Sequence, residues 1–166
     1  DAYTDGGATY VRDKGPHAMD MQLMGKAKLD GTLNLTTNTT TAFSTNGYGI
    51  VPHEVMDSLR SYTVLFAATP KLLSSQPRFY DFGYSSGNSL FFRANVLSAG
   101  IKYNGGTTTM VNASETLMAG TTYQLAVTFD ARSGVTSIYV NGQLVGSGTN
   151  NVNEPYMIAQ DAACTR

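Results

Sequence analysis

Apolar and polar residues alternate along one stretch near the C-terminal end of the chain. From Tyr123 to Phe129 every second side chain is apolar, and Gln124, Ala126 and Thr128 lie between them. A period of two is typical of a half-buried β-strand, because successive side chains point to opposite faces of a sheet. The pattern therefore predicts a strand with one face in a hydrophobic core.

Turn residues connect this stretch to a second alternating one. Asp130–Gly134 reads DARSG, and its glycine can adopt positive φ. Asn141–Gly142 follows the second stretch and is a strong signal for a two-residue hairpin of type I′, with Gln143–Gly146 starting a third strand. We expect four residues of this hairpin to be buried between two sheets: Val127, Phe129, Ile138 and Val140.

Short alternating stretches separated by turn residues recur upstream. They are Met19–Leu23, Leu29–Leu35 with a turn or bulge at Asp30–Gly31, Tyr62–Phe66, Arg78–Phe82, Ser89–Arg93 and Gly100–Tyr103. Val51–Leu59 differs, because its apolar residues lie four apart and predict one or two helical turns. Many short strands with little helix are typical of a β-sandwich or barrel. We therefore expect an all-β fold.

Four stretches, in this order along the chain, resemble the laminin-G-like, concanavalin A-like jelly-roll family: Tyr10–Gly31, Leu59–Pro70, Arg78–Asn95 and Val127–Gly148. The resemblance implies a two-sheet antiparallel jelly-roll sandwich, often sugar or protein binding, and in some members a calcium ion. The chain departs from the family in lacking tryptophan and in stopping at Gln160–Arg166. We expect residues 1–166 to form one such domain, either complete or a fragment of a longer protein.

Composition and charge exclude several classes of partner. Charged residues make up 14% of the 166 residues, and the formal net charge is −1, against roughly 25% charged residues in an average soluble domain. This balance gives no electrostatic reason to bind nucleic acid. No apolar run approaches the roughly 18 residues that a membrane helix needs. We therefore expect neither a nucleic-acid partner nor a membrane span.

Catalytic groups are sparse. Glycoside hydrolysis requires two carboxylates that face one bond, but glutamate occurs only at Glu54, Glu115 and Glu154, and no predicted strand carries two acids two residues apart. His17 and His53 are isolated, without the clustering of a zinc site. The sequence therefore predicts that the protein is not an enzyme.

Calcium is the ion that the sequence accommodates best. Its oxygen ligands come from carboxylates and loop carbonyls, and four aspartates fall at predicted strand ends or turns: Asp13, Asp20, Asp81 and Asp130. The simpler interpretation is that each aspartate caps its own turn through its side chain. Both interpretations are carried forward.

Two glycine-containing loops combine the residue types that bind sugars. They are Tyr84–Asn88, which reads YSSGN, and Lys102–Gly106, which reads KYNGG. A tyrosine ring offers a stacking face, asparagine offers a donor and an acceptor, and glycine lets a ligand approach the backbone. The candidate ligand-binding residues are Tyr84, Asn88, Arg93, Tyr103 and Asn104. The alternative is that both loops are ordinary hairpin turns.

These observations favour a non-catalytic carbohydrate-binding or adhesion module of an extracellular or surface protein, with a glycan or a glycosylated surface as its partner. The alternative is a structural module of a larger assembly, such as a virion fibre or decoration protein, with other subunits as partners. Either function places the protein outside the cell or on a cell or virion surface. The fold hosts many functions, so the resemblance alone selects no ligand.

Overall fold

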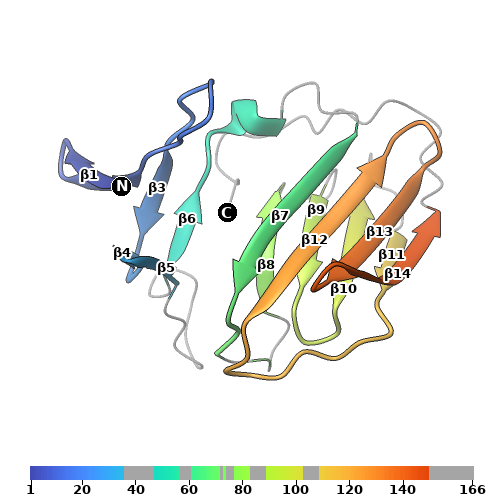
Figure 1. The fold of residues 1–166 in the computed structure, drawn as a ribbon. Helices are drawn as coiled ribbons and strands as arrows, with labels where there is room; N and C mark the ends of the chain where they lie inside the picture. Colours follow the sequence, from blue (N-terminus) through green and yellow to red (C-terminus); the bar gives the residue numbers. More distant parts are fainter. Residues whose placement is uncertain are drawn as a thin grey trace. The chain divides into compact units, whose positions relative to one another are not determined.

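The structure is a computed structural model that describes residues 1–35, 47–56, 61–71, 73, 77–82, 89–102 and 109–149. The described residues divide into two compact units: an N-terminal unit within Asp1–Val55 and a C-terminal unit within Met56–Cys164. Antiparallel β-strands dominate both units (Figure 1). The predicted all-β class is confirmed, and the single domain expected over residues 1–166 stays a prediction.

The N-terminal unit contains a four-stranded antiparallel sheet in the order β1-β2-β3-β6. Its strands are Ala2–Asp5 (β1), Ala8–Val11 (β2), Met21–Met24 (β3) and Tyr48–Ile50 (β6). Gly6 and Gly7, with φ of 54° and 83°, form the two-residue connection between β1 and β2. The alternating segment Leu29–Leu35 contributes to a small hairpin, Lys28–Asp30 (β4) and Thr32–Asn34 (β5), which turns at Gly31 with φ of 81°.

Helical structure is limited to one short segment among the described residues. A 3-10 helix, His53–Met56 (η2), lies inside the predicted helical segment Val51–Leu59. No helix in the described part of the chain is both long and apolar enough to cross a membrane.

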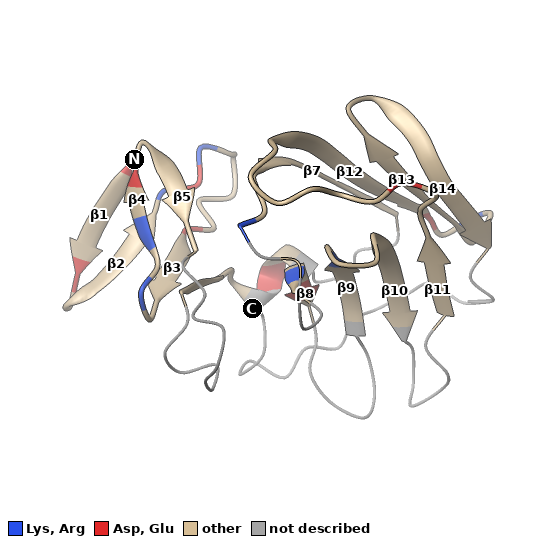
Figure 2. Cartoon of the chain, turned by 90° about the horizontal axis from the view of Figure 1, so that it is seen from below, with Lys and Arg blue, Asp and Glu red and all other residues tan. Residues whose placement is uncertain are grey.

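The C-terminal unit is a sandwich of two four-stranded antiparallel sheets, which Figure 2 shows as two layers. The first sheet has the order β14-β13-β12-β7, and the second sheet has the order β11-β10-β9-β8. The strands are Tyr62–Ala68 (β7), Arg78–Phe82 (β8), Ser89–Arg93 (β9), Ser98–Lys102 (β10), Thr109–Asn112 (β11), Tyr123–Asp130 (β12), Val135–Val140 (β13) and Gln143–Thr149 (β14).

The core of this unit lies between the inward faces of the two sheets. Val127 and Ile138 are 0% exposed, Phe129 is 3% exposed and Val140 is 2% exposed, which confirms their predicted burial. The second sheet contributes, among others, Leu90 and Phe92, both 0% exposed. Burial of apolar side chains is the main favourable term in folding, and the period of two places these side chains on the inward faces.

The turns of the first sheet form as the sequence predicts. Asn141 and Gly142 have φ of 50° and 82° and connect β13 to β14. Positive φ at both central residues matches a type I′ turn, whose twist suits two antiparallel strands. The Asn141 side chain also accepts a hydrogen bond from the Gln124 N–H at 3.0 Å, which ties the turn to the start of β12. Gly134, with φ of 71°, closes the turn between β12 and β13.

Candidate functional site

Strand order brings the described strand ends that flank the two predicted sugar-binding loops to one end of the second sheet. One loop joins β8 to β9 and the other joins β10 to β11, and Ser89 pairs with Lys102 between them. The described strand ends Phe82, Ser89, Lys102 and Thr109 therefore lie at the same end of the sheet. Four of the predicted ligand-binding residues lie outside the described residues: Tyr84, Asn88, Tyr103 and Asn104.

Arg93, the fifth candidate, lies at the opposite end of β9. It is four residues from Ser89, a separation of roughly 13 Å along a strand, and it pairs with Ser98 beside the β9–β10 turn. Its guanidinium carbon lies 4.7 Å from the centre of the Phe91 ring. The structure therefore does not bring Arg93 together with the ends of the two loops.

Phe91 is covered although it points away from the core. It pairs with Gly100, and a Cβ atom added at Gly100 would lie 2.2 Å from the Phe91 ring. The guanidinium carbon of Arg78 lies 4.5 Å from the centre of the same ring. With Gly100 against it and two guanidinium groups over it, Phe91 is 3% exposed. Cation–π packing thus closes an aromatic ring that would otherwise be available for stacking.

Two of the four candidate calcium ligands hold the β2–β3 connection of the N-terminal unit in place. Asp13 accepts hydrogen bonds from the Gly15 and Met19 N–H groups at 2.7 and 3.0 Å. Asp20 accepts one from the Tyr3 hydroxyl at 2.6 Å and one from the Asp13 N–H at 2.7 Å. Donation by Gly15 and Met19 lowers the pKa of Asp13, and donation by the Tyr3 hydroxyl and the Asp13 N–H lowers the pKa of Asp20.

The other two aspartates are also engaged within the protein. Asp130 accepts hydrogen bonds from the Ser133 hydroxyl at 2.7 Å and the Arg132 N–H at 3.0 Å, and these donors lower its pKa. Asp81 is ion-paired with Arg78. Three of the four carboxylates, Asp81 being the exception, thus stabilise turns or connections. In the described ranges no three His, Cys, Asp or Glu side chains are grouped as a metal ion would require.

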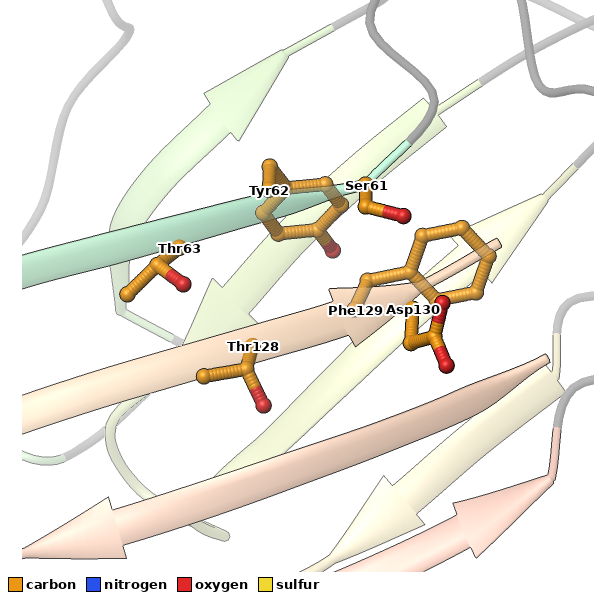
Figure 3. Close-up of a pocket in the computed structure, with 6 residues that line it drawn as sticks. All are labelled: Ser61, Tyr62, Thr63, Thr128, Phe129 and Asp130. Carbon is orange, nitrogen blue, oxygen red and sulfur yellow. The ribbon is translucent and has the colours of Figure 1, made fainter. Parts of the chain in front are cut away.

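A shallow depression lies at the Asp130 end of the first sheet, with a volume of about 360 Å³ (Figure 3). It is lined by Ser61, Tyr62, Thr63, Thr128, Phe129 and Asp130. β7 and β12 pair in register here, with Thr63 opposite Thr128 and Tyr62 opposite Phe129. The depression therefore combines the outward-facing hydroxyl groups of Ser61, Thr63 and Thr128 with the carboxylate of Asp130, whereas the rings of Tyr62 and Phe129 pack in the core.

The sequence analysis did not single out this depression. Thr63 and Thr128 are 65 positions apart in sequence (128 − 63) and read separately as ordinary polar positions of alternating strands. Only the pairing of β7 with β12 makes them neighbours. The one available signal was the common spacing of the two segments, in which a Thr lies next to an aromatic residue near a strand end.

Two rows of side chains cross the outward face of the first sheet. One row carries hydroxyl groups: Thr63, Thr128, Ser137 and Ser147. The other row is mostly apolar: Leu65, Ala126, Tyr139 and Leu144. Leu65 is 72% exposed and Leu144 is 58% exposed. Both rows are uncharged, so this face offers hydrogen bonds and apolar contacts without ion pairs.

A model of the concanavalin A-like lectin/glucanases superfamily, the Laminin G 3 family, matches residues 29–162. The chain belongs to this superfamily. The match confirms the resemblance drawn from the sequence and includes every described strand of the sandwich. A comparison with curated protein sequences finds no match.

Solved structures with similar folds support the jelly-roll assignment. "Crystal structure of HCR/D-Sa-GBL1/C" aligns with a TM-score of 0.65 and 16% identity over 93% of this chain and 40% of that chain. "Binding domain of Botulinum Neurotoxin DC in complex with SialylT" aligns with a TM-score of 0.62 and 17% identity over 90% of this chain and 39% of that chain. The chain thus spans about two fifths of the length of these structures, and the likeness is one of fold.

Proposed function

We propose that the chain is a non-catalytic carbohydrate-binding module of a secreted or surface-exposed protein. The observation that carries the proposal is membership of the concanavalin A-like lectin/glucanases superfamily over residues 29–162. A neighbour with the same fold over 90% of this chain is the binding domain of a botulinum neurotoxin, solved in complex with SialylT. The superfamily name covers both lectins and glucanases, so binding has to be separated from hydrolysis by the side chains present.

The side chains favour binding over hydrolysis. A glycosidase needs two carboxyl groups on either side of the scissile bond, roughly 5–10 Å apart. The described residues that line the depression on the first sheet include one carboxylate, that of Asp130, together with hydroxyl groups. Glu115 is exposed elsewhere in the same unit, outside the depression. One carboxylate can accept hydrogen bonds from a sugar, but it cannot act as both acid and base across one bond.

We place a sugar site at the loop end of the second sheet, with Tyr84, Asn88, Tyr103 and Asn104 as its contacts. The support is that the flanking strand ends, Ser89 and Lys102, are paired. Arg93 is assigned to packing on Phe91, because it lies at the far end of β9. Calcium remains part of the proposal as an ion that some members of the family bind, with Asp13, Asp20, Asp81 and Asp130 as the candidate ligands.

Glycan-array binding of the purified chain, with calcium and with a chelator, tests the proposal. We expect saturable binding to a defined set of sugars. The variants Tyr84→Ala, Tyr103→Ala and Asn104→Ala should weaken it, and the matched control Glu115→Ala, an exposed change in the same unit, should not. Absence of binding to any glycan by a folded chain would overturn the proposal. Binding that is unaffected by all three loop variants would move the site elsewhere.

The second candidate is a structural module of a larger assembly, such as a virion fibre or decoration protein. The observation that favours it is the apolar row on the outward face of the first sheet, where Leu65 and Leu144 are more than half exposed. Contacts between subunits typically cover such residues. Light scattering over a range of concentrations distinguishes it, because concentration-dependent assembly without glycan binding would favour this function.

A further inference from the structure

We propose that the depression lined by Ser61, Tyr62, Thr63, Thr128, Phe129 and Asp130 binds the hydroxyl groups of an uncharged sugar residue. The inference rests on carbohydrate binding as the proposed function. It adds a second site on the other sheet and a selectivity against acidic sugars. The depression has a volume of about 360 Å³, which falls within the range of roughly 300–1,000 Å³ for small-molecule sites.

Two threonine hydroxyls form the centre of the site. Thr63 and Thr128 are directly opposite on paired strands, so their Cβ atoms are roughly 5 Å apart. Both side chains point to the outward face, and within the described part of the chain neither hydroxyl has a hydrogen-bond partner. Each hydroxyl can donate one hydrogen bond and accept others. The pair therefore matches two neighbouring hydroxyl groups of a pyranose.

Two other hydroxyl groups of the same row already have hydrogen-bond partners. Ser137 and Ser147 continue the line of hydroxyls across β13 and β14, but their Oγ atoms lie 3.2 Å apart and hydrogen-bond to each other. A sugar that bound there would have to replace an existing bond, whereas at Thr63 and Thr128 it would add new ones. The available hydrogen-bonding capacity of the row is therefore concentrated in the depression.

Asp130 gives the site its selectivity. Its carboxylate is held by the Arg132 N–H and the Ser133 hydroxyl, and Ser61 accepts a hydrogen bond from the neighbouring Ala131 N–H at 3.0 Å. An ionised carboxylate only accepts hydrogen bonds and has about four acceptor positions, so it can also accept a sugar hydroxyl. Among the described residues that line the depression there is no Lys, Arg or His. An anionic sugar would meet like charge there without compensation.

The rings of Tyr62 and Phe129 lie on the core side of the sheet, behind the outward-facing groups of the depression. Their centres are 5.7 Å apart with an interplanar angle of 33°, and Phe129 is 3% exposed. In Figure 3 their side chains lie with Ser61 and Asp130 where β12 ends. The depression therefore offers a ligand mainly hydrogen-bonding groups, which a neutral pyranose with several hydroxyl groups can use.

The test is an NMR titration of the isotope-labelled full chain with methyl glycosides of glucose, galactose, mannose, fucose and N-acetylglucosamine, and with N-acetylneuraminic acid as the anionic arm. We expect at least one neutral glycoside to shift the amide signals of Thr63, Thr128 and Asp130 at millimolar concentration. The double variant Thr63→Val/Thr128→Val should lose about tenfold in affinity through two lost hydrogen bonds. Its melting temperature should stay close to that of the parent, because both changes are outward-facing and β-branched.

The matched control is Ser147→Ala, which removes a hydroxyl from the same row but outside the depression and should leave the affinity within about twofold of the parent. Amide shifts confined to the sheet end at Ser89 and Lys102 would overturn this site while supporting the proposed function. Preferential binding of N-acetylneuraminic acid at Thr63 and Thr128 would overturn the selectivity. Absence of binding to every sugar, here and on the glycan array, would overturn both proposals.

Discussion

On the outward face of the first sheet, Thr63 and Thr128 lie side by side in a row without charge. On the outward face of the second sheet, Phe91 lies against Gly100 and beneath the guanidinium groups of Arg78 and Arg93. The two faces belong to one sandwich and share one core. On the first face the hydroxyl groups of Thr63 and Thr128 have no hydrogen-bond partner among the described residues, whereas on the second face the aromatic ring is covered. Cross-strand neighbours, rather than residue types alone, make the difference.

The largest effect should separate the inward from the outward positions of the first sheet. Phe129→Ala removes a ring that is 3% exposed and should lower the free energy of unfolding by about 3–5 kcal/mol, as large-to-small core changes do. The matched control is Leu65→Ala on paired strand β7, where the side chain is 72% exposed and the change should stay within about 0.5 kcal/mol. Urea unfolding measures both. Similar losses in the two variants would contradict the assignment of faces.

The second effect tests the closed face of the second sheet. Gly100→Ala places a Cβ 2.2 Å from the tip of the Phe91 ring, so the ring must shift beneath Arg78 and Arg93. We expect a loss of about 1–3 kcal/mol, the usual cost of overpacking. Ser137→Ala is the control, because it inserts no atom into a packed position and removes only an exposed hydroxyl group on the open face, which should cost less than about 1 kcal/mol. Unchanged stability of Gly100→Ala would show that Phe91 has free space to move into.

Features of these two faces that lie within one segment of the chain were predicted from the sequence, and features that join distant segments were not. The strands β8 and β9 were placed at Arg78–Phe82 and Ser89–Arg93, and the turn at Asn141–Gly142 was placed correctly. Alternation and turn chemistry are local signals, so they can be read from one segment. The short strands β2 and β6 were not predicted, because three or four residues show too little periodicity. These strands form a sheet only through their pairing with β3.

The candidate site was harder to predict for the same reason. Neither the pairing of Thr63 with Thr128 nor the approach of Arg93 to Phe91 follows from residue spacing. The first depends on the register between β7 and β12, and the second depends on the bulk of a ring packed over Gly100. Sequence reasoning selected Arg93 for its hydrogen-bonding capacity, whereas its neighbours use it to cover an aromatic ring.

A third, smaller effect should sharpen the contrast at Arg93. Arg93→Ala removes one of the two guanidinium groups over Phe91 and should cost about 0.5–1 kcal/mol in unfolding free energy, with little effect on any glycan affinity. Arg132→Ala is the control, since that side chain is exposed in a turn and lies over no ring in the described structure. Loss of glycan binding in Arg93→Ala, with stability retained, would show that Arg93 belongs to the sugar site.

The smallest effect concerns the one carboxylate on the open face. Donation by the Ser133 hydroxyl and the Arg132 N–H lowers the folded-state pKa of Asp130. A lowered folded pKa contributes stability that is present above the unfolded pKa, about 3.9, and is lost as the pH falls through the folded value. Asp130→Asn does not titrate at this position. The parent should therefore unfold at a higher urea concentration than Asp130→Asn at neutral pH, and the difference should shrink as the pH falls below about 4.

Ser137→Ala is the control, and its difference from the parent should not vary with pH. A constant difference for Asp130→Asn would show that the hydrogen bonds of the turn do not favour the ionised form of Asp130.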